Sequence, residues 1–220
     1  MNIQDIVDIN YTISKDLFLK YENFWELLPN IKNYIIELGN SLDKEKYIQT
    51  NDNIWISISA KVSDSAKIIG PCIIDENTEI RHCAFIRGSV IVGKNCVIGN
   101  SCEIKNAIIF DNSQIPHFNY VGDSILGYKT HLGAGVILSN QKSDKSIIKI
   151  NNKGSIINTN LTKMGSIIGN HVEVGCNSVL NPGTIIKPNT TIYPLTRIRG
   201  VIEKDSIVKN ENTIIKKENR

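Results

Sequence analysis

A large aliphatic or aromatic residue recurs at every sixth position from Ile56 to Phe110. The series is Ile56, Val62, Ile68, Ile74, Ile80, Ile86, Val92, Ile98, Ile104 and Phe110, and a mostly small residue follows each member by four positions. On an α-helix a six-residue step turns about 240° and scatters these side chains over three faces. In extended chain the same positions share one face. The pattern therefore predicts a strand-and-turn solenoid, typical of a parallel β-helix, and excludes a helical protein.

Two interruptions divide the repeat. We expect the first at residues 115–119, after which the pattern resumes at Tyr120, Leu126, Leu132 and Leu138. The second is polar and runs from Ser139 to about Ser166, after which the series continues at Ile168, Val174, Leu180, Ile186, Ile192 and Ile198. Because long irregular segments in a compact repeat protein are usually functional, we expect the chemistry at these two places.

Both ends of the chain lie outside the repeat. Residues 1–54 contain Ile31, Tyr34, Ile35 and Leu38 at helical spacing after Asn30, with Gly39 as a natural stop. They predict a small N-terminal helical arm that packs on the first coil or on another subunit. Residues 55–203 form the predicted β-helix domain, and residues 204–220 a charged, frayed C-terminal tail.

Composition narrows the function classes. The net charge of the 220 residues is only +3, and no basic stripe is interleaved with aromatic side chains, so nucleic acid is not an expected partner. No apolar run reaches the roughly 18 residues of a membrane span, and the N-terminus is acidic where a secretory signal would be basic. Cys72, Cys96 and Cys102 occupy small inward positions, and there is no CxxC motif. These features predict reduced, buried thiols and a cytoplasmic protein.

The residues at the interruptions resemble a known family. They are Ile115-Pro116-His117-Phe118-Asn119-Tyr120-Val121-Gly122-Asp123-Ser124, Leu132-Gly133-Ala134-Gly135 and Ser139-Asn140. They are similar to the acetyltransferase half of bifunctional N-acetylglucosamine-1-phosphate uridyltransferase (GlmU) and to archaeal sugar-1-phosphate nucleotidylyltransferase/acetyltransferases. The whole chain resembles short bacterial proteins named after UDP-N-acetylglucosamine pyrophosphorylase. The resemblance covers about residues 55–203 and implies a left-handed parallel β-helix with a helical arm, assembled as a homotrimer with active sites between subunits.

The resemblance also implies roles for single residues. His117 matches the general base that takes a proton from the sugar amine, and Tyr120 matches a sugar-phosphate contact. Arg87 and Lys105 match phosphate-binding cations, and Asn140 matches a substrate-binding asparagine. The chemistry agrees, because a neutral amine needs a base that titrates near neutrality and a phosphate needs cations. Without the family match, His117 would be interpreted as a structural histidine, and Arg87 and Lys105 as ordinary solvated charges.

The resemblance also implies an acetyl-CoA groove, and some positions of this sequence differ from the family. Ala134 matches the alanine whose backbone meets acetyl-CoA, and a glycine-flanked backbone can approach a developing oxyanion closely. Gly175 and Cys176 match the Gly-Ser pair that contacts pantetheine. His131 stands where the family has an asparagine of the sugar pocket, and Gln141 replaces a tyrosine. These changes leave the identity of the amino sugar open.

The expected function is an acetyl-CoA-dependent N-acetyltransferase on an amino-sugar-1-phosphate, in nucleotide-sugar and cell-envelope biosynthesis, without a required metal. We expect no nucleotidyl transfer, because no GxGTRM-like loop is present and residues 1–54 are too few for such a domain. One alternative is a non-catalytic trimeric scaffold that binds sugar phosphate beside a separate nucleotidyltransferase. Another is a zinc γ-type carbonic anhydrase using His82 and His117, for which position 122 lacks the third ligand and His131 is a poor substitute.

Overall fold

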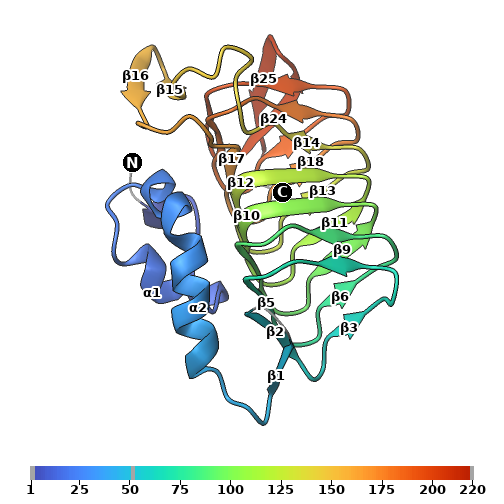
Figure 1. The fold of residues 1–220 in the computed structure, drawn as a ribbon. Helices are drawn as coiled ribbons and strands as arrows, with labels where there is room; N and C mark the ends of the chain where they lie inside the picture. The colour runs from blue at the N-terminus through green and yellow to red at the C-terminus, as the bar shows by residue number, and fades with distance from the viewer. Residues whose placement is uncertain (1–2, 51–52, 219–220) are drawn as a thin grey trace.

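The computed structural model describes residues 3–50 and 53–218 and contains a left-handed parallel β-helix of about nine turns. In Figure 1 the solenoid rises from the teal strands to the red ones, and the blue helical arm lies along one side. The fold predicted from the six-residue pattern is confirmed.

Each coil contributes short parallel strands to three faces. Face 1 contains β2 (Ile54–Ser57), β5 (Cys72–Ile74), β8 (Val90–Val92), β17 (Ser166–Ile168), β20 (Thr184–Ile186) and β23 (Val201–Ile202). Face 2 contains β3 (Lys61–Val62), β6 (Glu79–Ile80), β9 (Val97–Asn100), β11 (Gln114–His117), β13 (His131–Leu132), β18 (Glu173–Val174), β21 (Thr191–Ile192) and β24 (Ser206–Asn210). Face 3 contains β4 (Lys67–Ile68), β7 (Phe85–Ile86), β14 (Ile137–Leu138), β19 (Val179–Leu180) and β22 (Arg197–Ile198). Two longer strands, β10 (Glu103–Ile109) and β12 (Tyr120–Leu126), pass around the corner from face 3 to face 1.

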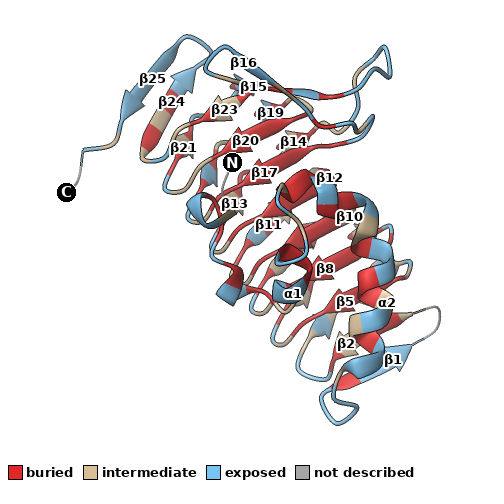
Figure 2. Ribbon diagram, turned by 90° about the vertical axis from the view of Figure 1, so that its left-hand side faces the viewer, coloured by how far each residue is buried: buried red, intermediate tan, exposed pale blue. Residues whose placement is uncertain are grey.

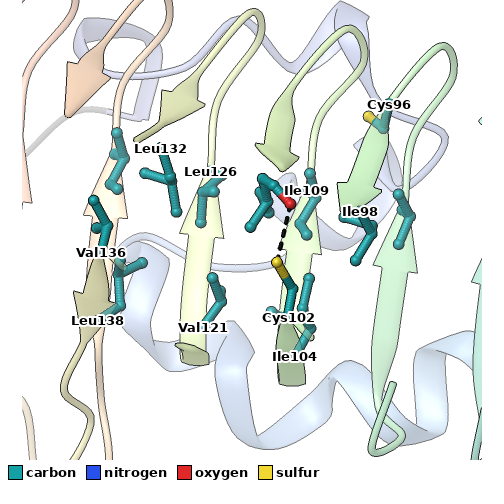
Figure 3. Close-up of a cluster of buried hydrophobic side chains, with 14 of the residues drawn as sticks. Cys96, Ile98, Cys102, Ile104, Ile109, Val121, Leu126, Leu132, Val136 and Leu138 are labelled. Carbon is teal, nitrogen blue, oxygen red and sulfur yellow. Dashed lines mark hydrogen bonds between the residues drawn. The ribbon is translucent and has the colours of Figure 1, made fainter. Parts of the chain in front are cut away.

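The repeating apolar side chains fill the interior. Figure 3 shows them pointing inward from neighbouring coils, with the Cys102 thiol donating a hydrogen bond to the carbonyl oxygen of Ile115 at 3.2 Å. Cys72, Cys96 and Cys102 are buried, as predicted, and burial raises the pKa of both Cys72 and Cys96 to about 12. These thiols therefore remain protonated and serve as small apolar side chains.

The predicted break at residues 115–119 is wrong. Strand β11 carries Ile115 into the core without interruption, and the pattern shifts instead at two corners where the step is five residues long. These corners contain Asn106 and Asp123, whose φ angles of 44° and 47° give a tight left-handed turn. Asparagine and aspartate tolerate that conformation better than other side chains with a Cβ, so the shortened step is local chemistry.

The shortened steps reassign two members of the series. Ile109 and Val121 point into the core, whereas the predicted Phe110 and Tyr120 point outward. Phe110 is nevertheless fully buried, because its ring meets Phe18 of the arm edge to face at 5.3 Å between centroids. A one-residue slip moves a side chain to the opposite side of a strand, and this caused the error.

Face 1 carries a second apolar series on its outside. Consecutive coils align the outward side chains of Trp55, Ile73, Ile91, Ile108, Ile125, Ile167 and Ile185 in register. The arm covers most of this stripe with α1 (Lys15–Phe18), α2 (Ile31–Ser41) and 3₁₀ turns at Ile3–Asp5, Ile9–Tyr11 and Phe24–Asn30. Figure 2 shows the arm lying across β5, β8, β10 and β12. The N-terminal segment therefore completes a second hydrophobic core outside the solenoid.

Helix α2 does not end at Gly39 as predicted but continues to Ser41. A Cβ at Gly39 would lie 2.4 Å from the Trp55 ring, so this glycine allows the helix to approach the first coil closely. Asn30 precedes the helix, but its side chain makes no capping hydrogen bond. The glycine therefore serves packing and not termination.

The polar insert and the C-terminal segment are both structured. The insert forms a hairpin of β15 (Lys149–Asn152) and β16 (Ser155–Asn158), and its Ile148, Ile150 and Met164 join the arm on face 1. After the insert the chain re-enters the solenoid in register with β12. The tail predicted to fray instead adds β24, whose Val208 enters the core, and β25 (Thr213–Lys216), which pairs with it antiparallel. β1 (Tyr47–Thr50) pairs antiparallel with β2 at the opposite end.

Candidate functional site

His117 lies at the corner where face 2 turns into face 3. Its backbone N–H donates to Asn119 Oδ1 at 3.1 Å, and its carbonyl accepts from the Gly135 N–H at 3.0 Å. Within the described chain the imidazole itself has no hydrogen-bond partner, and the residue is exposed. The backbone is therefore held while both ring nitrogens are open to a ligand.

Asn119 organises this corner and is buried, at 2% exposure. Besides accepting from His117, its Nδ2 donates to the Gly133 carbonyl at 2.8 Å and so ties two coils together. Phe118 between them has a φ of 52°, which the side chain of Asn119 helps to stabilise. The sequence comparison missed Asn119, although it lies inside the motif that contains His117.

The residues predicted to bind acetyl-CoA lie at the same corner, in the two coils that follow the coil of His117. The Asn177 N–H donates to the Ala134 carbonyl at 2.8 Å, and a Cβ on Gly133 would lie 2.7 Å from the Cys176 nitrogen. His117, Ala134 and Cys176 thus belong to three consecutive coils. Neighbouring strands are about 4.8 Å apart, so these residues form a column along the solenoid axis. Cys176 is exposed at this corner.

Gly175 is required by packing. A Cβ at this position would lie 2.4 Å from the backbone nitrogen of Pro194 in the next coil. At the same corner the side chains of Phe118 and Leu195 are 61% and 79% exposed, which leaves apolar surface beside the column. In the described chain the Ala134 N–H forms no backbone hydrogen bond. The column therefore offers an open donor next to an apolar rim.

A polar cluster occupies face 3 and its corner with face 1. Arg87 Nη1 lies 2.5 Å from Glu103 Oε1, and this hydrogen bond is the main reason that the pKa of Arg87 is raised. Lys105 Nζ lies 3.8 Å from Asp123 Oδ2. Tyr120 Oη donates to Asn140 Oδ1 at 3.3 Å, and Asn140 Nδ2 in turn donates to Asp123 Oδ2. Four residues predicted to bind substrate are thus brought together.

The cluster also contains residues that the sequence comparison did not assign. Asp123 is 6% exposed and accepts from Asn106 Nδ2 at 2.8 Å as well as from Asn140. Glu103 pairs with Arg87 across one coil. Asp123 belongs to the quoted motif, so the signal was present, but its partners Asn106 and Asn140 lie far from it in sequence. We call Lys105, Asn106, Tyr120, Asp123 and Asn140 the Asp123 cluster.

The structure does not bring His131 to this cluster. His131 points outward on face 2, where its Nδ1 lies 2.8 Å from Glu173 Oε2 in the next coil. It lines a shallow polar hollow with Gln114 and Lys129, on a different face from Tyr120. Within one chain, His131 and the Asp123 cluster are therefore separate surfaces.

The remaining site expectations concern the insert and metals. Of the insert, Asn140 belongs to the cluster and the backbone of Met164 and Gly165 hydrogen-bonds to it, while the hairpin packs on face 1. Residues 3–50 and 53–218 contain no group of three or more metal-binding side chains close enough to hold an ion. Among the same residues, no helix is long and apolar enough to cross a membrane.

Comparison with known proteins places this geometry in a family. Residues 68–192 match the family model described as GMPPB C-terminal domain. A bifunctional sugar-1-phosphate nucleotidylyltransferase/acetyltransferase of Sulfurisphaera tokodaii is 30% identical over 217 residues, 88% of this chain and 51% of that protein. The uncharacterized acetyltransferase YaiX of Escherichia coli O6:K15:H31 is 32% identical over 205 residues, 83% of this chain and 84% of that protein.

The extent of these matches differs. The bifunctional protein GlmU of Methanococcus aeolicus is 33% identical over 183 residues, 74% of this chain but only 44% of that protein. The chain thus spans about half the length of the two bifunctional relatives and most of the length of YaiX. The resemblance derived from the motifs is confirmed.

Proposed function

We propose that this chain transfers an acetyl group from acetyl-CoA to the amine of an amino-sugar-1-phosphate. The premise is that the chain belongs to the GMPPB C-terminal domain family and is an acyltransferase of the hexapeptide-repeat type. The observation that carries this proposal is the position of His117. Its unpartnered imidazole stands at the corner between the Ala134–Cys176 column and the face with Arg87 and Tyr120.

The phosphate is held by cations on face 3. Arg87 provides a planar fork that suits phosphate oxygens, and Lys105 provides a point charge. Each cation already has a carboxylate partner, Glu103 or Asp123, which holds it in place before substrate arrives. The phosphate then adds to these pairs, because five guanidinium and three ammonium N–H groups exceed what one carboxylate accepts.

Acetyl-CoA lies along the column at the corner of faces 2 and 3. The Ala134 N–H is available to the thioester oxygen or to the pantetheine amide, and Phe118 and Leu195 supply apolar contact. Gly175 lets the next coil, at Pro194, pack closely against this column. A preorganised N–H at a developing oxyanion lowers the barrier to acyl transfer.

The reaction is a single displacement at the thioester carbon. The neutral sugar amine attacks that carbon and forms the C–N bond while the His117 imidazole accepts the proton released from nitrogen. The tetrahedral intermediate collapses, the C–S bond breaks, and the CoA thiolate leaves and takes up a proton. No metal is needed for these steps. The product is an N-acetylated sugar phosphate for nucleotide-sugar biosynthesis.

We further propose that the chain assembles as a homotrimer. Face 1 is covered by the chain's own arm and insert, so contacts between subunits use faces 2 and 3. His131 on face 2 of one subunit then approaches the Asp123 cluster on face 3 of the next, which joins surfaces that one chain keeps apart. We propose that this assembly acts in the cytoplasm.

The experiment is a CoA-release assay with the purified protein and acetyl-CoA. Glucosamine-1-phosphate is compared with galactosamine-1-phosphate, with glucosamine lacking the phosphate, and with UDP-glucosamine. Light scattering in the same buffer gives the subunit number. Turnover that requires both the amine and the phosphate is expected. Binding of sugar phosphate without CoA release would instead identify a non-catalytic scaffold.

A further inference from the structure

Asp123 is a nearly buried carboxylate at the centre of the Asp123 cluster. It sits at the tight corner between faces 3 and 1, where its φ is 47°. Lys105 and Asn106 of β10 and Asn140 at the start of the insert all direct N–H groups toward it. A buried charge persists only when it is paired and hydrogen-bonded, and Asp123 meets that condition through these three groups.

The charge of Asp123 fixes the direction of a hydrogen-bond chain. An ionised carboxylate can only accept, so Asn140 must turn its Nδ2 toward Asp123. The carboxamide oxygen of Asn140 then faces outward and accepts from Tyr120 Oη at 3.3 Å. Burial, followed by the nearby charge of Asp123, raises the pKa of Tyr120, so the hydroxyl keeps its proton for this bond.

Close packing keeps the chain of hydrogen bonds intact. A Cβ at Gly122 would lie 2.7 Å from Tyr120 Oη and 3.0 Å from Asn140 Nδ2, so only glycine leaves room for the Tyr120–Asn140 contact. The end of the insert closes the far side, where the Met164 N–H donates to the Asn140 carbonyl at 2.9 Å and the Gly165 N–H to the Asp123 carbonyl at 2.8 Å. The backbone at both Asn140 and Asp123 is therefore held from outside the cluster.

We propose that Asp123 is a positioning residue that commits the only hydroxyl proton of Tyr120 to Asn140, so that Tyr120 accepts a hydrogen bond from the substrate. A tyrosine hydroxyl has one proton, and once this is donated inward only lone pairs face the ligand. Tyr120 would then recognise a hydroxyl or amine of the sugar, and Arg87 and Lys105 alone would hold the phosphate. This inference rests on the proposed amino-sugar-phosphate substrate and specifies which part of it each residue reads.

The test is Asp123→Asn, which keeps the shape and removes the acceptor-only group. An asparagine at 123 keeps only one of the two acceptor oxygens that face Asn106 and Asn140, so the Asn140 carboxamide is no longer held in one orientation and Tyr120 is free to donate outward. Calorimetry measures the dissociation constants of glucosamine-1-phosphate and inorganic phosphate for each protein. We expect the preference for the amino sugar phosphate over inorganic phosphate to fall about tenfold. A loss of affinity shared equally by both ligands, or an unchanged preference, would overturn the inference.

A second variant keeps the test informative if Asp123→Asn does not fold. Tyr120→Phe removes the acceptor from a partly exposed position and should lower the same preference about as much. In the double variant the two losses should not add, because both act on one hydrogen bond to substrate. Tyr120→Phe with an unchanged preference contradicts the inference.

The matched control is Asp205→Asn. Asp205 also sits at a left-handed corner, with φ 56°, and accepts from an asparagine, Asn189 Nδ2, at 3.1 Å. Its replacement should leave the ligand preference unchanged. Acetyl transfer by the wild-type protein is measured separately. Binding without transfer would refute the proposed activity and leave this test valid, whereas wild-type protein that prefers neither ligand would refute the inference.

Discussion

Faces 1 and 3 of the solenoid are both built from short parallel strands with apolar inward residues, but their outer surfaces are opposite in character. On face 1 the outward positions are isoleucines stacked in register, such as Ile91, Ile108 and Ile125, and all three are fully buried. On face 3 the outward positions include Glu103, Lys105 and Tyr120, which remain partly exposed. The outward residue of each hexad therefore decides what covers a face: apolar rows recruit the chain's own arm, and polar rows are left for a ligand.

The two faces also differ in what they contribute. Burying one isoleucine side chain is worth about 1.5–3 kcal/mol, so the stripe on face 1 holds the arm firmly. The Arg87–Glu103 ion pair of face 3 lies at the surface, where such a pair adds at most about 1 kcal/mol to stability. Variants on face 1 should therefore change stability, and variants at the site should change activity.

The largest expected effect is loss of acetyl transfer in His117→Ala. Removing a general base costs about 10²–10⁴-fold in rate, measured as CoA release at saturating substrate. The melting temperature should not change, because only the backbone of His117 is hydrogen-bonded within the described chain. His82→Ala is the matched control, since His82 occupies the same corner two coils away. Full activity in His117→Ala would refute the assignment of the base.

The next effect belongs to face 1. Ile108→Ala removes a fully buried side chain between the solenoid and the arm and should lower the free energy of unfolding by about 2–5 kcal/mol, measured by denaturant titration. Ile137→Ala is the control, because Ile137 points outward on face 3 and is only half-buried. Its cost should stay below about 1 kcal/mol. Equal losses in the two variants would show that the arm does not protect face 1.

A smaller effect is expected where the arm meets the corner of faces 1 and 2. The rings of Tyr11 and Tyr128 stack with centroids 3.8 Å apart, and the Asp111 N–H donates to the Tyr11 carbonyl at 3.1 Å. Tyr11→Ala should destabilise the arm by about 0.5–1.5 kcal/mol. Hydrogen exchange should show faster exchange of the arm amides alone. Leu19→Ala, at a 65% exposed position in the same segment, should leave the exchange rates unchanged.

The smallest effect is a pH dependence at the same corner. Burial raises the pKa of the Asp111 carboxyl, so the fold favours its neutral form. Its contribution to stability is present at acidic pH and is lost as pH rises through the raised value. Asp111→Asn should therefore raise the free energy of unfolding at neutral pH by less than about 1 kcal/mol, seen as a slightly higher melting temperature, and the gain should vanish at acidic pH. A gain that persists or grows in acid would contradict this origin.

Much of the fold could be predicted from the six-residue period, because a period that fits extended chain and not a helix leaves few architectures. The sequence also contains the apolar stripe of face 1, since an isoleucine directly precedes Ile74, Val92 and Ile109 and faces the other side of each strand. The corners at Asn106 and Asp123 could not be placed, because a one-residue shortening reverses sidedness without changing composition. That error assigned Phe110 to the wrong core.

The sequence by itself determined the solenoid, its inward side chains and the motif around His117, because these depend on local periodicity and on short sequence motifs. Only the tertiary structure decided which outward residues meet. Lys105, Asp123 and Asn140 lie about one coil apart in sequence and touch because the coils stack in register. The tertiary structure likewise places the insert on face 1, where its apolar residues pack against the isoleucine stripe. It also places His131 on a different face from Tyr120. Contacts between coils depend on register, and register is a property of the stacked chain.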